Sequence, residues 1–233
     1  MKIIKATYAM FWHCNLFGGM LMIILQLALD FTDLHDALEV AKEARDYVDW
    51  IEAGTPLIKS CGMSSIRALK KEFPGKKVVA DMKIMDTGAL EVKLAADAGA
   101  DVITVMAAAD LSTVREAIAE GRRLGKIVVV DTIGTEPTKV EEIECMAPDY
   151  ICPHVGIDQQ RRGVKLEDVV RKTKMRVPMA VGGGINSKTA GDFVRAGAKV
   201  IIVGNAITRA GDVRGEAKKV RDAIDSVERD LLN

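Results

Sequence analysis

The chain has 233 residues, of which 48% are hydrophobic, so it can bury one large core. Its 33 basic and 33 acidic residues cancel, which excludes a global field that would recruit nucleic acid or an anionic membrane surface. We therefore expect any anionic ligand to be held locally.

The four cysteines form no C-x-x-C pair and show no metal-ligand spacing, and a chain of this size does not need disulfide bonds to be stable. We expect a reducing, cytoplasmic setting. Cys145 and Cys152 lie in or beside apolar runs and are expected to be small core residues.

The first twenty-odd residues carry two lysines and two apolar runs, which superficially resembles a signal peptide. No A-x-A-like cleavage site follows. Polar residues and glycines interrupt the run of about twenty apolar residues that a membrane span would need. We therefore predict that residues 1–21 are an N-terminal extension and that residues 22–233 form one catalytic domain.

From Ile23 onward, short β-branched or apolar runs alternate with charged segments of helical period. The predicted strands are 23–29, 48–51, 78–80, 102–105, 127–130, 150–152, 179–181 and 200–203. The predicted helices that follow them are 33–47, 64–72, 87–98, 112–123, 139–144, 166–171, 187–195 and 215–232, with Asp33 as the cap of the first.

These βα units, joined by short connections, predict a closed (β/α)8 TIM barrel in a single domain. A doubly wound open sheet is the alternative. It would carry a glycine fingerprint after its first strand, where this chain has Asp30-Phe31-Thr32. In two Ala-Gly-Ala segments, Gly99 and Gly197 are expected to end helices that lead into strands.

The strand at 78–80 ends in three ionisable residues, Asp81, Lys83 and Asp86. Because alternate side chains of a strand share a face, Asp81 and Lys83 should point the same way. Asp86 follows the strand, where a turn could direct it back at Lys83 or out toward another subunit. Two carboxylates around one ammonium keep it protonated, which suits proton donation to a carbanion or enolate. A surface ion-pair cluster is the alternative.

Polar residues also end the other predicted strands, and in parallel barrels the chemistry lies at these carboxyl ends. We group them as one candidate site that contains Asp30, Glu52, Asp81, Lys83, Asp131 and His154. Four carboxylates are too many like charges to leave uncompensated, so we expect a divalent cation, and all-oxygen ligation favours Mg²⁺ over zinc. The alternatives are a solvated charge at Glu52 and a buried core histidine at His154.

Two glycine-containing loops follow the last two strands, Gly182-Gly183-Gly184 and Gly204-Asn205. Glycine lets backbone N–H groups approach an anion at the start of a helix. The loops after strands seven and eight are the usual phosphate site of these barrels. They predict a phosphorylated small molecule as ligand, and tight turns without a ligand are the alternative.

Together these residues resemble the orotidine 5′-monophosphate decarboxylase suprafamily and, within it, the 3-hexulose-6-phosphate synthase family. The resemblance runs from about Ile24 to the C-terminus. The motifs that carry it, besides the glycine loops, are Ala28-Leu29-Asp30, Ile51-Glu52-Ala53-Gly54-Thr55, Asp81-x-Lys83-x-x-Asp86 and His154-Val155-Gly156-Ile157-Asp158.

The resemblance implies a reversible, Mg²⁺-dependent aldol condensation of formaldehyde with ribulose 5-phosphate, which gives 3-hexulose 6-phosphate through an enediolate. It implies that Glu52 and Asp81 hold the metal and that Lys83 stabilises the enediolate. It further implies that His154 handles protons and that Asp30 contacts substrate hydroxyls.

The resemblance also implies a homodimer in which Asp86 reaches the neighbouring subunit's site. One departure is Asn205, where relatives often carry an arginine that binds phosphate. Backbone donors must then bind more of the phosphate, with Arg209 as a substitute.

Two other functions remain as alternatives. A 3-keto-L-gulonate 6-phosphate decarboxylase would use the same scaffold, but it carries an arginine three residues after its strand-six histidine, where this chain has Ile157. A non-catalytic barrel that binds sugar phosphates would not need the full set of acids, base and glycines.

Overall fold

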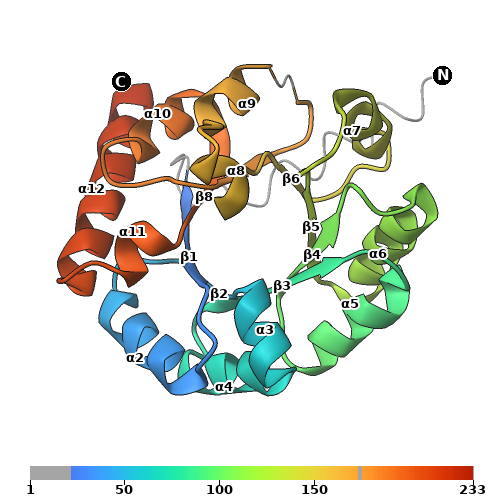
Figure 1. The fold of residues 1–233 in the computed structure, drawn as a ribbon, viewed down its shortest axis with the longest axis horizontal. Helices are drawn as coiled ribbons and strands as arrows, with labels where there is room; N and C mark the ends of the chain where they lie inside the picture. Colours follow the sequence, from blue (N-terminus) through green and yellow to red (C-terminus); the bar gives the residue numbers. More distant parts are fainter. Residues whose placement is uncertain (1–21, 173–174, 233) are drawn as a thin grey trace.

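The computed structural model describes residues 22–172 and 175–232. Residues 1–21, for which the sequence predicts an extension, lie outside the described residues. Within the described part, the strands close into one parallel barrel in the order β1-β2-β3-β4-β5-β6-β7-β8, surrounded by helices (Figure 1). The prediction of a (β/α)8 TIM barrel is confirmed.

Each strand lies close to its predicted position. The strands are β1 Ile24–Leu29, β2 Trp50–Ala53, β3 Lys77–Ile84, β4 Val102–Met106, β5 Ile127–Asp131, β6 Tyr150–Cys152, β7 Met179–Gly182 and β8 Ala198–Val203. The barrel closes where β8 pairs with β1, with Val203 opposite Leu27. At the base of this seam, the backbone N–H of Ile23 donates to Oε1 of Glu228, near the end of the chain, at 2.6 Å.

The helices form the outer ring in Figure 1. They are α2 Leu34–Ala44, α3 Thr55–Cys61, α4 Ser64–Glu72, α5 Gly88–Asp97, α6 Leu111–Leu124, α7 Pro137–Glu144, α8 Ile157–Arg161, α9 Leu166–Lys172, α10 Ala190–Arg195, α11 Asn205–Thr208 and α12 Val213–Leu232. The short helices α3, α8 and α11, of 7, 5 and 4 residues, were not predicted. Across 22–172 and 175–232, no helix is long and apolar enough to span a bilayer.

Helix boundaries follow the local chemistry that the sequence indicates. The side chain of Asp33 accepts the backbone N–H groups of His35 and Asp36, which caps α2 as predicted. Gly99 and Gly197 adopt φ angles of 102° and 95° just after α5 and α10, the left-handed conformation expected of residues that end helices.

The core has two layers because successive strand residues face opposite sides of the barrel wall. On β1, Leu25, Leu27 and Leu29 are fully buried against the helices. A second cluster fills the barrel interior, where the rings of Trp50 and Tyr150 meet edge to face with centroids 5.9 Å apart. The packed interior leaves only the ends of the barrel available for chemistry.

At the amino-terminal end of the barrel, called the base below, the same hydrogen bond recurs at three strands. An aspartate just before β2, β4 and β6 accepts a backbone N–H from the preceding strand. The pairs are Asp49 with Leu25, Asp101 with Val78 and Asp149 with Val128, at 2.8, 2.9 and 2.8 Å. Each aspartate satisfies a donor at the start of a strand, so these carboxylates support the sheet.

Candidate active site

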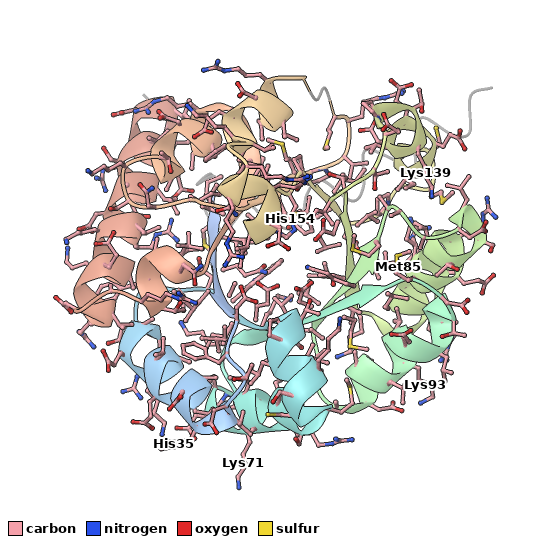
Figure 2. The ribbon with its side chains drawn as sticks, viewed as in Figure 1. His35, Lys71, Met85, Lys93, Lys139 and His154 are labelled. Carbon is pink, nitrogen blue, oxygen red and sulfur yellow. The ribbon has the colours of Figure 1, made fainter. Side chains whose placement is uncertain are left out.

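A cavity of about 600 Å³ opens at the carboxyl ends of the strands, called the mouth below. Figure 2 shows His154 beside this central opening, whereas His35 and Lys71 lie on the outer rim of the molecule. All six residues grouped from the sequence line the cavity, as do both glycine loops. These are Asp30, Glu52, Asp81, Lys83, Asp131, His154, Gly182, Gly183, Gly184, Gly204 and Asn205.

Asp81 and Lys83 are in direct contact, as predicted, but β3 extends beyond the predicted end at residue 80. Nζ of Lys83 lies 2.7 Å from Oδ2 and 3.0 Å from Oδ1 of Asp81. The strand does not alternate regularly here. Its register with β4 shifts between Ala80 and Ile84, and Lys83 has a φ angle of 46°, in the left-handed region that non-glycine residues rarely adopt.

The second carboxylate beside Lys83 is Asp131 of β5, whose Oδ2 lies 3.4 Å from Nζ. Burial alone would lower the pKa of Lys83, but the charges of Asp81 and Asp131 outweigh burial and raise it above its usual range. Lys83 is therefore a permanent cation in the wall of the cavity.

Asp86 does not turn back toward Lys83 in this chain. Its side chain is exposed, its Oδ1 accepts the backbone N–H of Thr87 at 2.7 Å, and it is not part of the cavity lining. Three exposed apolar side chains lie on the same β3–α5 segment, Met85, Leu90 and Leu94. The sequence left two directions open for the Asp86 side chain, back toward Lys83 or out toward another subunit. Within this chain, Asp86 does not contact Lys83.

His154 is held by a carboxylate in the cavity wall and is not buried in the core. Its Nδ1 lies 2.7 Å from Oδ2 of Asp131. Burial would raise the pKa of Asp131, but the hydrogen bond and charge of His154, together with Lys83, hold it below its usual value. An ionised Asp131 fixes the imidazole through Nδ1 and leaves Nε2 as the nitrogen available to a substrate.

Glu52 is buried in β2, and its Oε2 accepts a hydrogen bond from Nε2 of Gln26 at 2.8 Å. Burial, followed by the charges of Asp81 and Asp30, raises the pKa of Glu52 well above its usual value. Burial and the charge of Asp81 also raise the pKa of Asp30. The mouth is therefore short of positive charge, which is the condition that a bound cation would relieve.

Sequence reasoning missed three polar residues that hold these acids. Gln26 holds Glu52, while Thr55 and Thr104 donate to Asp81 through Oγ1, at 2.6 Å to Oδ2 and 2.9 Å to Oδ1. The available signal was a polar residue in an otherwise apolar strand, as with Gln26 in β1 and Thr104 in β4.

Glu52 and Asp81 are the carboxylates best placed to hold a metal ion. They lie on neighbouring strands, both are buried, and both line the cavity. Among residues 22–172 and 175–232, no three His, Cys, Asp or Glu side chains form a metal-binding group. Two carboxylates suit a hard cation that takes its remaining ligands from water or substrate oxygens, as Mg²⁺ does.

The glycine loops after β7 and β8 bring the backbone close to the cavity beside His154 and Asp30. Gly183 has a φ angle of 116°, and a Cβ at this position would overlap the carbonyl oxygen of Val155, so a side chain cannot be accommodated. Gly204 and Asn205 form the start of α11. Arg209 is exposed and outside the lining, and no arginine of the described residues lines this cavity. The predicted substitution by Arg209 is therefore not supported.

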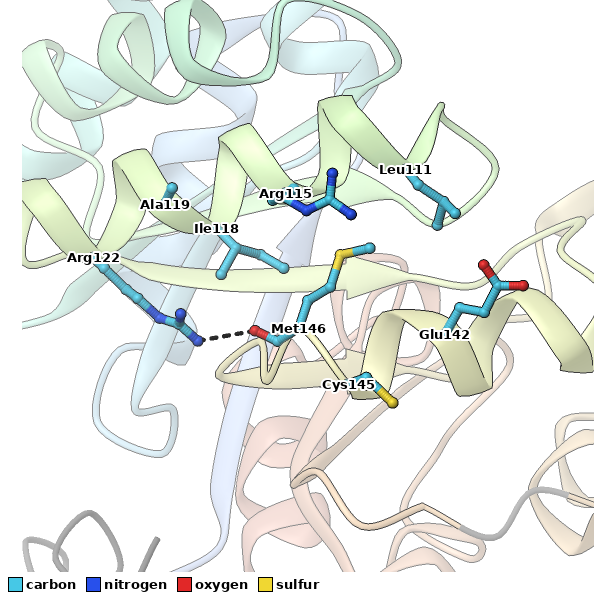
Figure 3. A pocket seen from close by; sticks show the side chains of 8 residues that line it. All are labelled: Leu111, Arg115, Ile118, Ala119, Arg122, Glu142, Cys145 and Met146. Atoms are coloured by element: carbon cyan, nitrogen blue, oxygen red, sulfur yellow. Dashed lines mark hydrogen bonds between the residues drawn. The ribbon is translucent and has the colours of Figure 1, made fainter. Parts of the chain in front are cut away.

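A second hollow, of about 510 Å³, lies on the outer surface between α6 and α7 (Figure 3). Arg122 donates to the backbone oxygen of Met146 there, at 3.1 Å. Cys145 borders this groove and is exposed, so its prediction as a core residue is wrong, whereas Cys152 is buried as predicted. Cys145 is the residue that directly follows α7. None of the grouped strand-end residues lies in this groove.

Comparison with known proteins shows which family the sequence matches. Residues 24–220 match the orotidine 5′-phosphate decarboxylase / HUMPS family. The 3-hexulose-6-phosphate synthase of Mycobacterium gastri is 42% identical over 204 residues, which cover 86% of this chain and 99% of that protein.

Solved structures of the same family are also similar to this chain. A crystal structure of a 3-hexulose-6-phosphate synthase superimposes with a TM-score of 0.84 at 42% identity, over 87% of this chain and 100% of that one. A 3-keto-L-gulonate-6-phosphate decarboxylase from Vibrio cholerae reaches a TM-score of 0.79 at 28% identity, over 88% of this chain and 99% of that one.

Proposed function

The chain belongs to the orotidine 5′-phosphate decarboxylase / HUMPS family, and we propose that it is an aldolase-type lyase that condenses formaldehyde with ribulose 5-phosphate. The product is 3-hexulose 6-phosphate, and the reaction is reversible. The observation that carries this proposal is the mouth itself, where a fixed cation, a carboxylate-held histidine and two buried acids face two glycine loops. The synthase of Mycobacterium gastri, at 42% identity, supports the same reaction.

The substrate's phosphate binds to the loops that contain Gly182, Gly183, Gly184, Gly204 and Asn205. Without side chains, these glycines let backbone N–H groups approach an anion, although the N–H of Gly182 itself donates to the carbonyl oxygen of Pro153 at 3.2 Å. Asp30 contacts the substrate hydroxyls. With the phosphate at the glycine loops, the rest of the sugar occupies the cavity that Lys83 and His154 also line.

We infer that Glu52 and Asp81 bind Mg²⁺. Both acids are buried oxygen donors, and burial, followed by the negative charges of Asp81 and Asp30, raises the pKa of Glu52. Lys83 contacts both oxygens of Asp81, so release of one contact frees an acceptor position for a cation. When bound, Mg²⁺ supplies electrostatic stabilisation of negative charge on substrate oxygens.

Two side chains carry the proton transfers and the charge stabilisation. His154 removes a proton from the carbon next to the substrate carbonyl through Nε2, and the resulting enediolate attacks the carbon of formaldehyde. The protonated imidazole then returns this proton to the former formaldehyde oxygen, so that the reaction balances. Asp131 keeps the imidazole in place, and the ammonium of Lys83 stabilises the enediolate's negative charge.

The direct test is to follow formaldehyde loss with purified protein, ribulose 5-phosphate and Mg²⁺. We expect activity that disappears after chelation and returns with Mg²⁺. His154→Gln should lower kcat by about 10² or more, the usual loss when a positioned base is removed. His35→Gln, on the exposed first turn of α2, is the matched control and should keep the wild-type rate. Absence of formaldehyde loss in the folded wild type would refute the proposed reaction.

We further propose a homodimer with shared sites. Asp86 does not line its own cavity, and the exposed apolar side chains of Met85, Leu90 and Leu94 lie on the same β3–α5 segment, where a second copy can cover them. Inactive Asp86→Ala and Lys83→Ala subunits, when mixed, should then recover part of the activity, because each hybrid dimer contains one intact site. No recovery after demonstrated subunit exchange would argue against shared sites.

The decarboxylase alternative rests on the structural likeness to the Vibrio cholerae enzyme. Against it stands Ile157, a cavity residue whose apolar side chain cannot orient the water that would protonate an enediolate. Ile157→Arg should shift the ratio of the two reactions toward decarboxylation of 3-keto-L-gulonate 6-phosphate. If the wild type prefers that substrate in kcat/KM, the decarboxylase is the correct function.

For the cellular setting, we propose the cytoplasm. The free thiols of Cys61, Cys145 and Cys152 are consistent with a reducing compartment. We also keep the proposal that residues 1–21 are an extension and that the catalytic domain begins at residue 22.

A further inference from the structure

The irregular end of β3 depends on one hydroxyl group from the neighbouring strand. Pairing between β3 and β4 is regular up to Ala80 opposite Ile103 and resumes with Ile84 opposite Val105. β3 thus advances four residues while β4 advances two, and Thr104 is the β4 residue that faces the gap. Thr104 is buried, with 6% of its surface exposed.

Thr104 makes two hydrogen bonds across this gap. Its Oγ1 accepts the backbone N–H of Lys83 at 3.0 Å and donates to Oδ1 of Asp81 at 2.9 Å. The direction of both bonds is fixed, because an N–H can only donate and an ionised carboxylate can only accept. One hydroxyl therefore replaces the ladder bond that Lys83 lacks and orients the carboxylate two residues before it.

This arrangement explains how Lys83 keeps a left-handed backbone. A φ angle of 46° is unfavourable for lysine and persists only where surrounding contacts hold it. The conformation brings Nζ to 2.7 Å from Asp81 and 3.4 Å from Asp131. The β-branched threonine has restricted χ1 rotation, so its hydroxyl is held in one direction.

We propose that Thr104 is a positioning residue for the reaction, which fixes the Asp81 carboxylate and the backbone of Lys83 through its single hydroxyl. The inference rests on the proposed aldolase function for its kinetic consequence. Thr104 does not act on the substrate itself. Its effect should therefore appear in kcat and not in the binding of the sugar phosphate.

Three variants test this. Thr104→Val keeps the shape but removes both hydrogen bonds, and we expect kcat to fall by about 30-fold to 100-fold with the KM for ribulose 5-phosphate changed less than about threefold. Thr104→Ser restores the hydroxyl and should recover kcat to within about fivefold of wild type. Thr113→Val is the matched control, since Thr113 is also buried but lies on α6 outside the cavity, and it should leave kcat unchanged.

Two kinetic results would overturn the proposal. One is a Thr104→Val enzyme with wild-type kcat. The other is a Thr104→Ser enzyme as impaired as the valine variant, which would mean that the hydroxyl is not responsible. If the wild type does not consume formaldehyde, the proposed function fails, and crystal structures then decide this inference separately. A left-handed Lys83 still beside Asp81 and Asp131 in Thr104→Val would overturn it, whereas loss of that geometry would support it.

Discussion

Both ends of this barrel carry several acidic side chains, but their partners differ. At the base, Asp49, Asp101 and Asp149 each accept a backbone N–H from the neighbouring strand. At the mouth, Gln26 holds Glu52, while His154 and Lys83 contact Asp131, which also accepts the N–H of Ile133 two residues further along its own loop. Both mouth acids line a cavity. An acid satisfied by the backbone supports the fold, whereas acids gathered beside one another around a cavity are available for chemistry. The number of carboxylates alone does not distinguish the two roles.

The largest expected effect compares one lysine at each end. Lys83 contacts Asp81 at the mouth at 2.7 Å, and Lys70 contacts Asp101 at the base at 2.6 Å. Lys83→Ala should lower kcat by at least about 10², because a charge that stabilises the enediolate is lost. Lys70→Ala should keep kcat and lower only the melting temperature. Steady-state kinetics and thermal unfolding of both variants measure the contrast, and an active, folded Lys83→Ala protein would reduce Lys83 to an ion-pair role.

The second effect concerns stability, where the two ends should respond with opposite signs. Asp101→Asn should lower the free energy of unfolding by about 1.5–3 kcal/mol, the range for hydrogen bonds to a charged group. Glu52→Gln should instead raise the melting temperature of the metal-free protein, because it removes a buried charge beside Asp81 and Asp30. Urea unfolding in the presence of a chelator tests both. A destabilised Glu52→Gln protein would contradict the view that this acid is retained for function at a cost in stability.

The smallest effect is the pH dependence of the stability changes that Glu52→Gln and Asp101→Asn cause. The pKa of Glu52 is raised by burial, so its destabilising effect grows above the unfolded value of about 4.3 and is absent below it. Burial opposes ionisation of Asp101, but Lys70 and the N–H of Val78 lower its pKa, so its stabilising effect is complete above about pH 3.9 and is lost as pH falls through the folded value. On acidification, the gain of Glu52→Gln should vanish first and the loss of Asp101→Asn second. Unfolding curves between about pH 7 and pH 2 would show the order, and the reverse order would mean that the two acids do not differ in this way.

Hydrophobic periodicity was sufficient to predict the barrel, because each strand and its following helix carry their own pattern. It was also sufficient to place the acids at the mouth, since parallel strands bring their carboxyl ends together. It could not predict that Asp131, 48 residues away, is the second partner of Lys83, because that contact exists only once β3, β4 and β5 lie side by side. The sequence suggested Asp86 as the second carboxylate beside Lys83 only because the two residues are close in sequence.

The left-handed Lys83 was equally beyond a reading of the sequence. A lysine after a short apolar run predicts ordinary alternation, and nothing local indicates that β3 gains extra residues against β4. The cause lies in Thr104 on another strand. As a polar residue in an apolar strand, Thr104 could be noticed in the sequence, but its pairing with Lys83 and Asp81 could not, because threonine is common in strands.

The seam between β1 and β8 has a consequence for how the chain is made. The barrel closes only when β8 pairs with β1 and Glu228 accepts the backbone N–H of Ile23, a contact between residues 205 positions apart. During synthesis on the ribosome, β1 therefore emerges long before its last partner exists. In that interval one edge of β1 presents unpaired backbone groups, which is the kind of edge that chaperones and other nascent chains meet first.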